Sequence, residues 1–437
     1  MTTHSPRAMS LALALALFVG RGAAADAPEK TAEGDLSQVG DVGPAPTSLE
    51  GLLELQLSDS EARLAFEQAL ELIGEEYAGW EITEGDLYLG AIAGMVQVLN
   101  TREHQGPAST TAPGPELNAL MTTEDSRYVN QMERGHKTGI GIEFQASTAE
   151  GLLYITRVYP GSPADRNGIR AGDRVAGIDG NALQQRDLQS ILGFLRGSEG
   201  TPIGLTLLRG ATPAIRIDLM LTRAVYDLPS VETRLVSEQV GLMRISQFHG
   251  GTATEVRDGL ADMQAVGITS LILDLRGNQG GLLSSILEVA SMLLGEEAVL
   301  ARLLDARGRE RDLVTGGNPE FEGPMVCLVN RWTGSGAEML ASAIQENGRA
   351  RLVGENTAGK ATTETLYRLA PGLHLRLTTT AMRSPLGDTW QGEGLTPDFV
   401  VQGGTVSMPF DEETTWPFLD VQLGFALDLL VNQSLAP

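Results

Sequence analysis

The sequence predicts an α/β protein built from several domains. Its 437 residues exceed the length of one ordinary domain, and 42% of them are apolar, enough to fill more than one core. In the second half, apolar runs with β-branched members alternate with helical patterns, which indicates strands joined by helical crossovers. The expected strands and helices of this part are 240–245, 253–266, 271–275, 282–294, 325–329, 337–347 and 373–377.

The first 25 residues have the pattern of a secretory signal peptide. Arg7 is followed by an apolar stretch at 11–19 and by three alanines at 23–25. The apolar stretch is too short to span a bilayer of about 30 Å. We therefore expect cleavage after Ala25 and export to the periplasm, with no membrane anchor.

Two further segments precede the main domains. Residues 26–57 are rich in acidic residues, glycine, alanine and proline without periodicity, which is typical of a linker. Residues 58–135 are predicted to form a small helical region, because apolar residues recur at helical spacing after Ser58 and again at 87–99. The polar stretch 101–115 is expected to be a surface loop.

Charge and cysteine content exclude several classes of function. The net charge of −24 argues against nucleic-acid binding, since phosphate neutralisation needs a basic surface. Cys327 is the only cysteine in the sequence and stands in the predicted strand 325–329, so we expect a core residue and no internal disulfide. The five histidines are scattered and show no zinc-ligand spacing, so neither a metal nor another cofactor is expected.

Ser335 and Lys360 are the residues that most strongly suggest catalysis. Ser335 lies between the predicted strand and the next helix, near the helix N-cap, where serine is also common for structural reasons. A serine hydroxyl becomes a nucleophile when a base takes its proton, and a lysine can be that base only as the free amine. A lysine ordinarily titrates near 10.4, so this role needs a pKa lower by about 3, which corresponds to about 4 kcal/mol. Burial among apolar neighbours can supply such a change.

The motifs around these residues follow one another in a characteristic order. They are Leu-Asp-Leu-Arg-Gly-Asn-Gln-Gly-Gly at 273–281, Thr-Gly-Ser-Gly-Ala-Glu at 333–338, Gly-Glu-Asn-Thr-Ala-Gly-Lys at 354–360 and Gly-Glu-Gly-Leu-Thr-Pro-Asp at 392–398. Over about residues 60–430 this order resembles the carboxyl-terminal processing peptidases, the tail-specific serine proteases with a Ser–Lys dyad. The resemblance implies a serine endopeptidase with a crotonase-like α/β core at 226–437 that ends in a helical segment.

The resemblance also implies roles for individual residues. Ser335 would be the nucleophile and Lys360 the general base. The amide of Gly336 and one amide of the pair Gly280 and Gly281 would form the oxyanion hole. Just before that pair, Asp274 and Arg276 are expected to be structural residues that fix its loop by hydrogen bonds or an ion pair.

Residues 136–225 resemble a PDZ domain inserted before the core. Gly139, Ile140, Gly141 and Ile142 are similar to the carboxylate-binding loop of such domains, and 162–165 and 168–175 match the later turn, helix and strand. The amides of this loop can capture a peptide C-terminus while the peptide adds as a strand. We therefore expect protein or peptide C-termini as partners, with an adaptor protein or a second copy of the chain as further alternatives.

Glu364 departs from the family pattern and keeps a second function open. The family usually has a glutamine four residues after the lysine, which helps to hold the amine, so the resemblance makes Glu364 the candidate residue that orients Lys360. A carboxylate there could keep Lys360 protonated, or could be neutral or turned away. The alternative is a catalytically impaired, PDZ-bearing binding or adaptor protein on a protease fold. A Ser–His hydrolase that uses His249 is a third, weaker alternative, because Lys360 already fits the position of the base.

Overall fold

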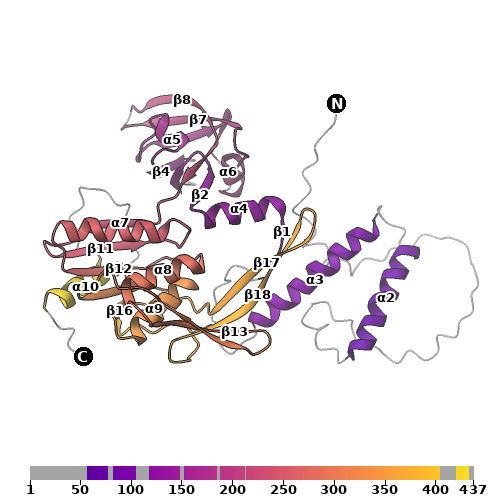
Figure 1. Ribbon diagram of the computed structural model, residues 1–437. Coiled ribbons are helices and arrows are strands. Elements are labelled where there is room, and N and C mark those ends of the chain that lie inside the picture. Colours follow the sequence, from indigo (N-terminus) through magenta and orange to yellow (C-terminus); the bar gives the residue numbers. More distant parts are fainter. Residues whose placement is uncertain are drawn as a thin grey trace, which may run out of the picture. The chain divides into compact units, whose positions relative to one another are not determined.

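The computed structural model describes residues 57–76, 82–104, 118–147, 152–184, 188–211, 213–403 and 420–432 (Figure 1). The predicted signal peptide and all but the last residue of the predicted linker lie outside these ranges. The chain forms two compact units, Met1–His104 and Gln105–Pro437. Among the described helices, none combines the length and the apolar character needed to cross a bilayer.

The first unit contains the predicted helical region. Its helices are α2 (Asp59–Glu76) and α3 (Glu84–His104). The surface loop expected from residue 101 was placed too early, because α3 continues to His104. The reason is local: residues 101–104 include no glycine or proline, and the first such breaker is Gly106.

The PDZ domain is built on an antiparallel sheet with strand order β3-β4-β5-β7-β8. Its apolar residues form a core of their own, which includes Leu153, Val175 and Leu207. Among the described strands β3 pairs only with β4, so it is an edge strand of this sheet. The elements are β2 (His136–Gly139), β3 (Ile142–Ser147), β4 (Leu152–Val158), α5 (Pro163–Arg166), β5 (Arg174–Ile178), β6 (Asn181–Ala182), α6 (Leu188–Leu195), β7 (Pro202–Arg209), β8 (Ile215–Thr222) and β9 (Ala224–Asp227).

Two segments connect this domain to the rest of its unit. The chain enters after β1 (Ala119–Thr122) and α4 (Thr123–Glu133) and leaves after β9. β2 and β9 pair antiparallel, so the incoming and outgoing chains run side by side. The amide of Leu228 donates to the carbonyl of Gly135 at 2.8 Å, which closes this pair at its base.

The protease core contains a six-stranded sheet of order β10-β11-β12-β15-β16-β19, parallel except for β10. Helices α7, α8 and α9 pack with one face of this sheet, and α10 packs with the other. The elements are β10 (Val231–Leu235), β11 (Val240–Ile245), α7 (Thr252–Ala265), β12 (Ser270–Asp274), α8 (Leu283–Leu294), β15 (Met325–Val329), α9 (Gly336–Glu346), β16 (Arg351–Gly354), β19 (Phe399–Val400) and α10 (Val421–Val431).

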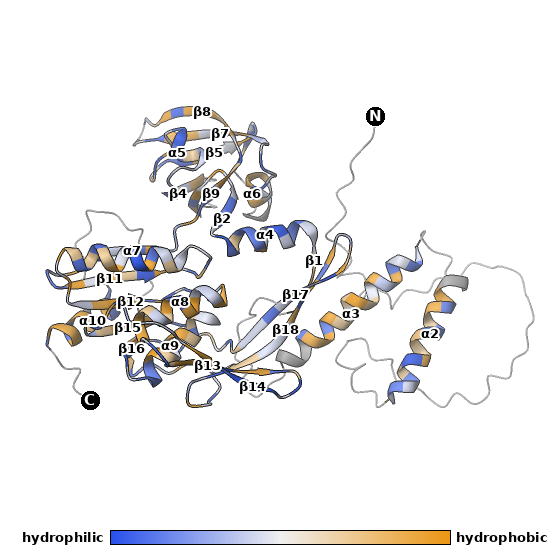
Figure 2. Ribbon diagram, in the orientation of Figure 1, coloured by the Kyte–Doolittle hydropathy of each residue, from blue (hydrophilic) through white to orange (hydrophobic). Residues whose placement is uncertain are grey.

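β15 shows why this part could be predicted. All five of its residues are buried, because helices cover both faces of the sheet. A strand in that position carries an unbroken apolar run. Figure 2 shows the same apolar character on α8 and α10, which pack on the two faces.

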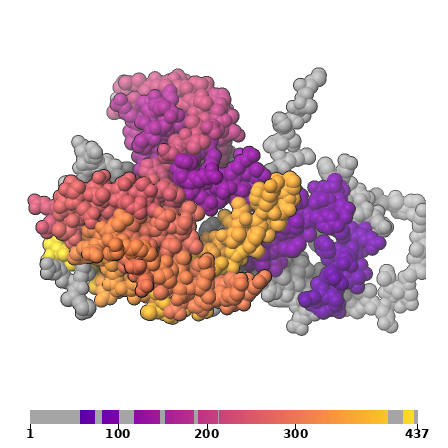
Figure 3. Space-filling model, viewed as in Figure 1, coloured from indigo at the N-terminus to yellow at the C-terminus, as the bar shows by residue number. Residues whose placement is uncertain are grey.

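A second sheet has the order β1-β18-β13-β14, with β17 also paired to β18. Its later strands are β13 (Val299–Asp305), β14 (Glu310–Val314), β17 (Thr362–Ala370) and β18 (Leu373–Arg383). The strand predicted at 373–377 is longer than expected, because residues up to Arg383 pair with β13. Figure 3 shows the β17–β18 hairpin, in yellow-orange, at the surface of the molecule, where Tyr367 and Leu369 are exposed.

Candidate active site

The candidate residues lie after three neighbouring parallel strands, β12, β15 and β16. The loop after β12 carries Gly280 and Gly281, the turn after β15 carries Ser335, and the loop after β16 carries Lys360. Because the strands are parallel and adjacent, their carboxyl ends meet at one edge of the sheet. This edge is where open α/β sheets bind their ligands.

Ser335 has a backbone conformation that is rare for a residue with a side chain. Its φ is 54° and its ψ is −122°, at the N-cap of α9. The turn is fixed from the preceding loop: the Thr333 hydroxyl donates to the carbonyl of Leu275, and the amide of Gly334 donates to the carbonyl of Asn278. Strained conformations of this kind persist where the surrounding structure imposes them, often at reactive residues.

Glu338 joins the serine turn to the lysine loop. The amides of Ser335 and Lys360 both donate to its Oε2 at 2.8 Å, so the backbones of these two residues are neighbours. The amide of Gly359 donates to Oε1 at 2.7 Å, and the hydroxyl of Thr357 also donates to Oε1. The side chain is fully buried. Burial raises the pKa of Glu338 to about 7, although these hydrogen bonds lower it.

Sequence reasoning assigned no role to Glu338. A signal was present, because a serine followed three residues later by glutamate before an apolar run is the pattern of a helix capping box. That pattern explains the bond between Glu338 and the Ser335 amide. It does not predict the three donors from residues 357–360, which come from a different loop.

The lysine loop is held by residues 390–392, where the motif Gly-Glu-Gly-Leu-Thr-Pro-Asp (392–398) begins. The indole nitrogen of Trp390 donates to the carbonyl of Lys360 at 3.1 Å, and the amide of Gly392 donates to the carbonyl of Gly359 at 2.6 Å. The Gln391 side chain accepts from the Ala361 amide. The backbone of Lys360 is therefore fixed on both sides.

The side chain of Lys360 faces Glu364. Its Nζ lies 2.8 Å from Oε1 of Glu364, and the two side chains are 29% and 19% exposed. The contact is a close ion pair that does not meet hydrogen-bond geometry. Within the described residues, no hydrogen bond joins the Ser335 hydroxyl to the Lys360 amine. The carboxylate therefore faces the lysine, which contradicts the alternative that it is turned away.

The glycine pair lies against the serine turn. A methyl group on Gly280 would be 2.6 Å from the amide nitrogen of Gly336 and 3.1 Å from Cβ of Ser335. The Gly280 amide itself donates to Oδ1 of the buried Asn278 at 2.8 Å. Of the two glycines, Gly281 is therefore the better candidate to donate to an oxyanion together with Gly336.

Asp274 and Arg276 form an ion pair with two hydrogen bonds of 2.8 and 2.9 Å. Arg276 also bonds Asp420 and Gln422, so the pair ties the glycine loop to the start of α10. Burial opposes the charge of Arg276, but the two aspartates hold its pKa above the ordinary value. These contacts agree with the structural role expected for the two residues.

His249 is buried, and both of its ring nitrogens contact backbone groups. Nε2 lies 2.8 Å from the carbonyl oxygen of Leu228, and Nδ1 lies 3.0 Å from the amide nitrogen of Gly251. Neither nitrogen is directed at Ser335. This arrangement argues against a Ser–His catalytic pair. Cys327 is fully buried in β15, and burial raises the pKa of its thiol, as for an unreactive core residue.

The predicted carboxylate-binding loop joins β2 to the edge strand β3. The carbonyl of Ile140 accepts from Ala164, and the carbonyl of Gly141 accepts from Tyr159. In a trans peptide the carbonyl and the next amide point in opposite directions, so the amides of Gly141 and Ile142 point away from these partners. Gly141 has φ 81°, and a methyl group there would be 2.1 Å from Cβ of Ser162. Only glycine fits at this position.

Fold and site together define an α/β serine peptidase that carries a PDZ domain. The family model for peptidase family S41 matches residues 239–401, and the PDZ model matches residues 154–209. The carboxyl-terminal-processing protease of a Picosynechococcus species is 32% identical over 316 residues, which cover 72% of this chain and 75% of the relative. The protein of the same description from a Synechocystis species is 32% identical over 317 residues, covering 72% and 73%.

The chain therefore belongs to the carboxyl-terminal-processing proteases of peptidase family S41. A crystal structure of a Bacteroides fragilis protein described as an S41 protease shares the fold, with 18% identity and a TM-score of 0.50. The matched region covers 75% of this chain and 91% of the Bacteroides fragilis protein. The expected fold class and the expected serine peptidase are thus confirmed. Both family matches fall inside the ranges predicted for the two domains, whose boundaries stay predictions.

Proposed function

We propose that this peptidase is an endopeptidase in which Ser335 is the nucleophile and Lys360 the general base. The observation that carries the proposal is Glu338, which accepts hydrogen bonds from the amides of both residues. One buried carboxylate therefore fixes the two backbones relative to each other. The strained conformation of Ser335 gives independent support.

The reaction begins when Lys360, as the free amine, takes the proton of the Ser335 hydroxyl while Oγ attacks the scissile carbonyl. The amides of Gly336 and Gly281 donate to the oxyanion, a contribution of about 3–4 kcal/mol per donor in comparable sites. The lysine then gives its proton to the leaving amine, and an acyl group remains on Ser335. A water molecule, deprotonated by the same lysine, releases the acyl group and restores the serine.

The ion pair with Glu364 supports a second candidate function. A lysine that faces a carboxylate at 2.8 Å is stabilised as the ammonium, and an ammonium cannot accept the serine proton. If the pair persists during substrate binding, the protein is a binding or adaptor protein on a protease fold. We favour the peptidase, because a bound substrate that excludes water can redistribute this proton.

We further propose that the PDZ domain binds the C-terminal tails of protein substrates. The supporting features are the unpaired edge of β3 and the outward direction of the Gly141 and Ile142 amides. A tail can add to β3 as a strand while these amides receive its carboxylate. Export to the periplasm is a third proposal, based on Arg7, the apolar stretch and the alanines before residue 26. It predicts a mature N-terminus after Ala25, which mass spectrometry of periplasmic fractions can test.

The central test is hydrolysis of β-casein and of a fluorogenic peptide library by the purified protein. We expect the native protein to cleave and Ser335→Ala and Lys360→Ala to be inactive. Native protein without activity, but with intact tail binding, would favour the adaptor. Activity that survives in Lys360→Ala and disappears in His249→Ala would favour the Ser–His hydrolase.

A further inference from the structure

His249 contacts both segments that connect the PDZ domain to the protease core. On the outgoing segment, the carbonyl of Leu228 lies 2.8 Å from Nε2. On the incoming segment, Gly135 lies against the ring, and a methyl group there would be 2.6 Å from Nδ1. The neighbouring Gly250 amide donates to the carbonyl of Glu133 at 2.8 Å. The loop around His249 is therefore bonded to the chain on both sides of the PDZ domain.

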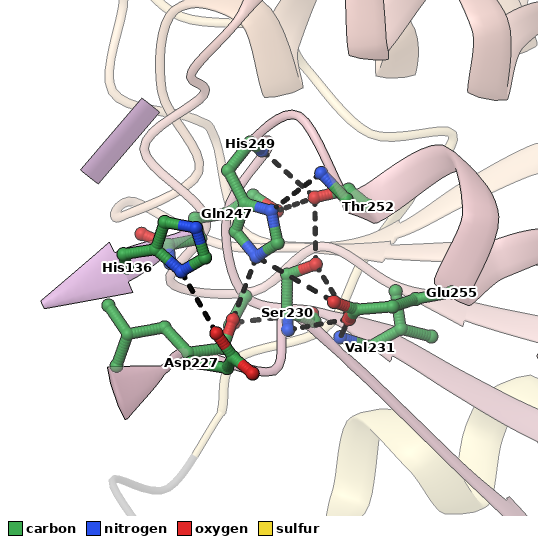
Figure 4. A network of polar contacts seen from close by, with 11 residues as sticks. His136, Asp227, Ser230, Val231, Gln247, His249, Thr252 and Glu255 are labelled. Carbon is green, nitrogen blue, oxygen red and sulfur yellow. Dashed lines mark hydrogen bonds and ion pairs between the residues drawn. The ribbon is translucent and has the colours of Figure 1, made fainter. Parts of the chain in front are cut away.

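The ring of His249 has a defined hydrogen pattern. The amide of Gly251 donates to Nδ1 at 3.0 Å, so Nδ1 is the acceptor and the hydrogen is on Nε2. Nε2 can then donate to the carbonyl of Leu228, which fixes the ring between the turn and the connecting segment (Figure 4). The nearest carboxylate oxygen, from Glu255, is 3.8 Å from Nε2, beyond hydrogen-bond distance. The histidine thus donates to the outgoing segment through Nε2 and accepts from its own turn through Nδ1.

A polar network holds the same segment around the ring. The hydroxyls of Ser230 and Thr252 are 2.7 Å apart, and Thr252 accepts from the amide of His249 at 2.9 Å. Glu255 accepts from the amides of Ser230 and Val231 at 2.7 and 3.0 Å. Figure 4 shows these side chains converging on the chain just after β9.

The residue before His249 holds the glycine pair of the active site. Phe248 donates its amide to the carbonyl of Gly280 at 3.0 Å and accepts from the amide of Leu282 at 2.7 Å. Gly281 is so close that a methyl group there would lie 2.0 Å from the Phe248 carbonyl oxygen. Gly280 in turn lies against the amide of Gly336. Phe248 and His249 therefore connect the two segments that flank the PDZ domain to Gly281 and, through Gly280, to Gly336.

We infer that His249 is a positioning residue that aligns the oxyanion hole by fixing Phe248 relative to the two PDZ connecting segments. Within the described part of the chain its ring forms no hydrogen bond with Ser335, and it acts through the backbone of Phe248. This inference rests on the proposed function, because it assumes that Gly281 and Gly336 stabilise the oxyanion. Displacements of about 1 Å at such donors are enough to lower the rate substantially.

The chain offers a matched pair of substitutions at this position. In His249→Gln the amide nitrogen can replace Nε2 and keep the donor to Leu228. In His249→Asn the carbonyl oxygen can replace Nδ1 and keep the acceptor for Gly251, but the donor to Leu228 is lost. The pair therefore separates the link to the connecting segment from the local turn. As a control, His136→Ala removes an exposed ion pair with Asp227 on the same two strands and should have no effect.

The full-length variants are compared by kcat and KM on one fluorogenic peptide, by affinity for the matching peptide aldehyde, and by thermal unfolding. The aldehyde adds to the serine and places an oxyanion in the hole, so its affinity reports on the two amides. For His249→Asn we expect kcat to fall about tenfold or more with KM unchanged, and aldehyde affinity to fall by a similar factor. His249→Gln should stay within about threefold of the native enzyme.

Native kcat and aldehyde affinity in His249→Asn would overturn the inference, as would equal defects in the asparagine and glutamine variants. If His249→Asn does not fold, Gly135→Ala tests the same link from the incoming segment, and native kinetics there would overturn it. Ser335→Ala distinguishes a failure of the proposed function from a failure of the positioning role. If Ser335→Ala still cleaves the peptide, the proposed function is wrong, whereas an inactive Ser335→Ala beside native-like His249 variants rejects only the positioning role.

Discussion

Replacing Glu364 with glutamine removes one charge of the ion pair with Lys360 while keeping the size of the side chain. The two charged atoms are 2.8 Å apart, and both side chains are mostly buried. For unit charges at this separation, Coulomb's law gives about 6 kcal/mol at an effective dielectric constant of about 20 and about 1.5 kcal/mol in bulk water. Desolvation of both groups offsets part of the attraction, so we expect a net effect of about 1.5–3 kcal/mol.

This energy favours the ammonium form of Lys360, which cannot act as the base. In Glu364→Gln the transfer of the serine proton to the amine should therefore cost less. Since about 1.4 kcal/mol corresponds to a factor of ten, kcat/KM should rise about tenfold or more. The prediction concerns the rate only, because the glutamine leaves the backbone of the loop in place.

The assay is kcat/KM on one fluorogenic peptide at neutral pH. Glu238→Gln serves as the control, since it makes the same change of net charge at an exposed turn between β10 and β11. Equal kcat/KM in Glu364→Gln and in the native enzyme would refute the reasoning. Lower kcat/KM in the variant would refute it too, because the carboxylate would then be needed to orient the amine.

Three other predictions concern the dyad, the PDZ loop and Glu338. We expect hydrolysis to be lost and tail binding to be kept in Ser335→Ala and Lys360→Ala, because the two residues act as one unit. Lys360→Arg should be inactive as well, because arginine cannot release its proton. Turnover close to native in any of these variants would be inconsistent with the dyad. On Ser335→Ala protein, a peptide with an amidated C-terminus should bind at least tenfold more weakly than the free acid, and Gly141→Val should remove this difference. Equal affinities would exclude carboxylate capture. Burial raises the pKa of Glu338 from 4.5 to about 7, so the folded native protein loses a bound proton's stabilisation over this range. Measured by calorimetry, the free energy of unfolding of the native protein should fall by about 3 kcal/mol relative to that of Glu338→Gln as the pH rises from 4.5 to 7. A difference that does not change with pH would contradict this.

Local patterns were enough to predict the elements that carry the candidate site. The apolar run of β15 follows from burial on both faces of its sheet, and the position of Ser335 follows from the strand and helix on either side of it. The PDZ loop was also visible, because Gly141 occupies a conformation and a space that exclude other side chains. In each case the physical cause lies within a few residues of the pattern.

Contacts between distant segments could not be predicted in this way. Nothing near Glu338 indicates that residues 357–360 donate three hydrogen bonds to it, and nothing near His249 indicates Leu228 or Gly135 as its neighbours. The choice between Gly280 and Gly281 as the oxyanion donor also depends on contacts that the sequence does not show. The Gly280 amide is engaged by Asn278, and that bond becomes visible only when the loop is folded.

Glu338 and Glu364 affect two different measured properties, the stability of the fold and the rate of hydrolysis. Glu338 has its pKa raised by burial, and among the described residues its carboxylate meets four donors but no cation. If Glu338 takes up a proton, it can donate to the Thr357 hydroxyl, which already accepts from the amide of Leu395, and its bonds to the Ser335 and Lys360 amides remain. Its protonation therefore changes the stability of the fold and leaves the alignment of the dyad intact. Glu364 has the converse position, because its charge acts on the Lys360 amine and so on the rate. Substitution of Glu364 should consequently change the rate, and substitution of Glu338 should change how stability depends on pH.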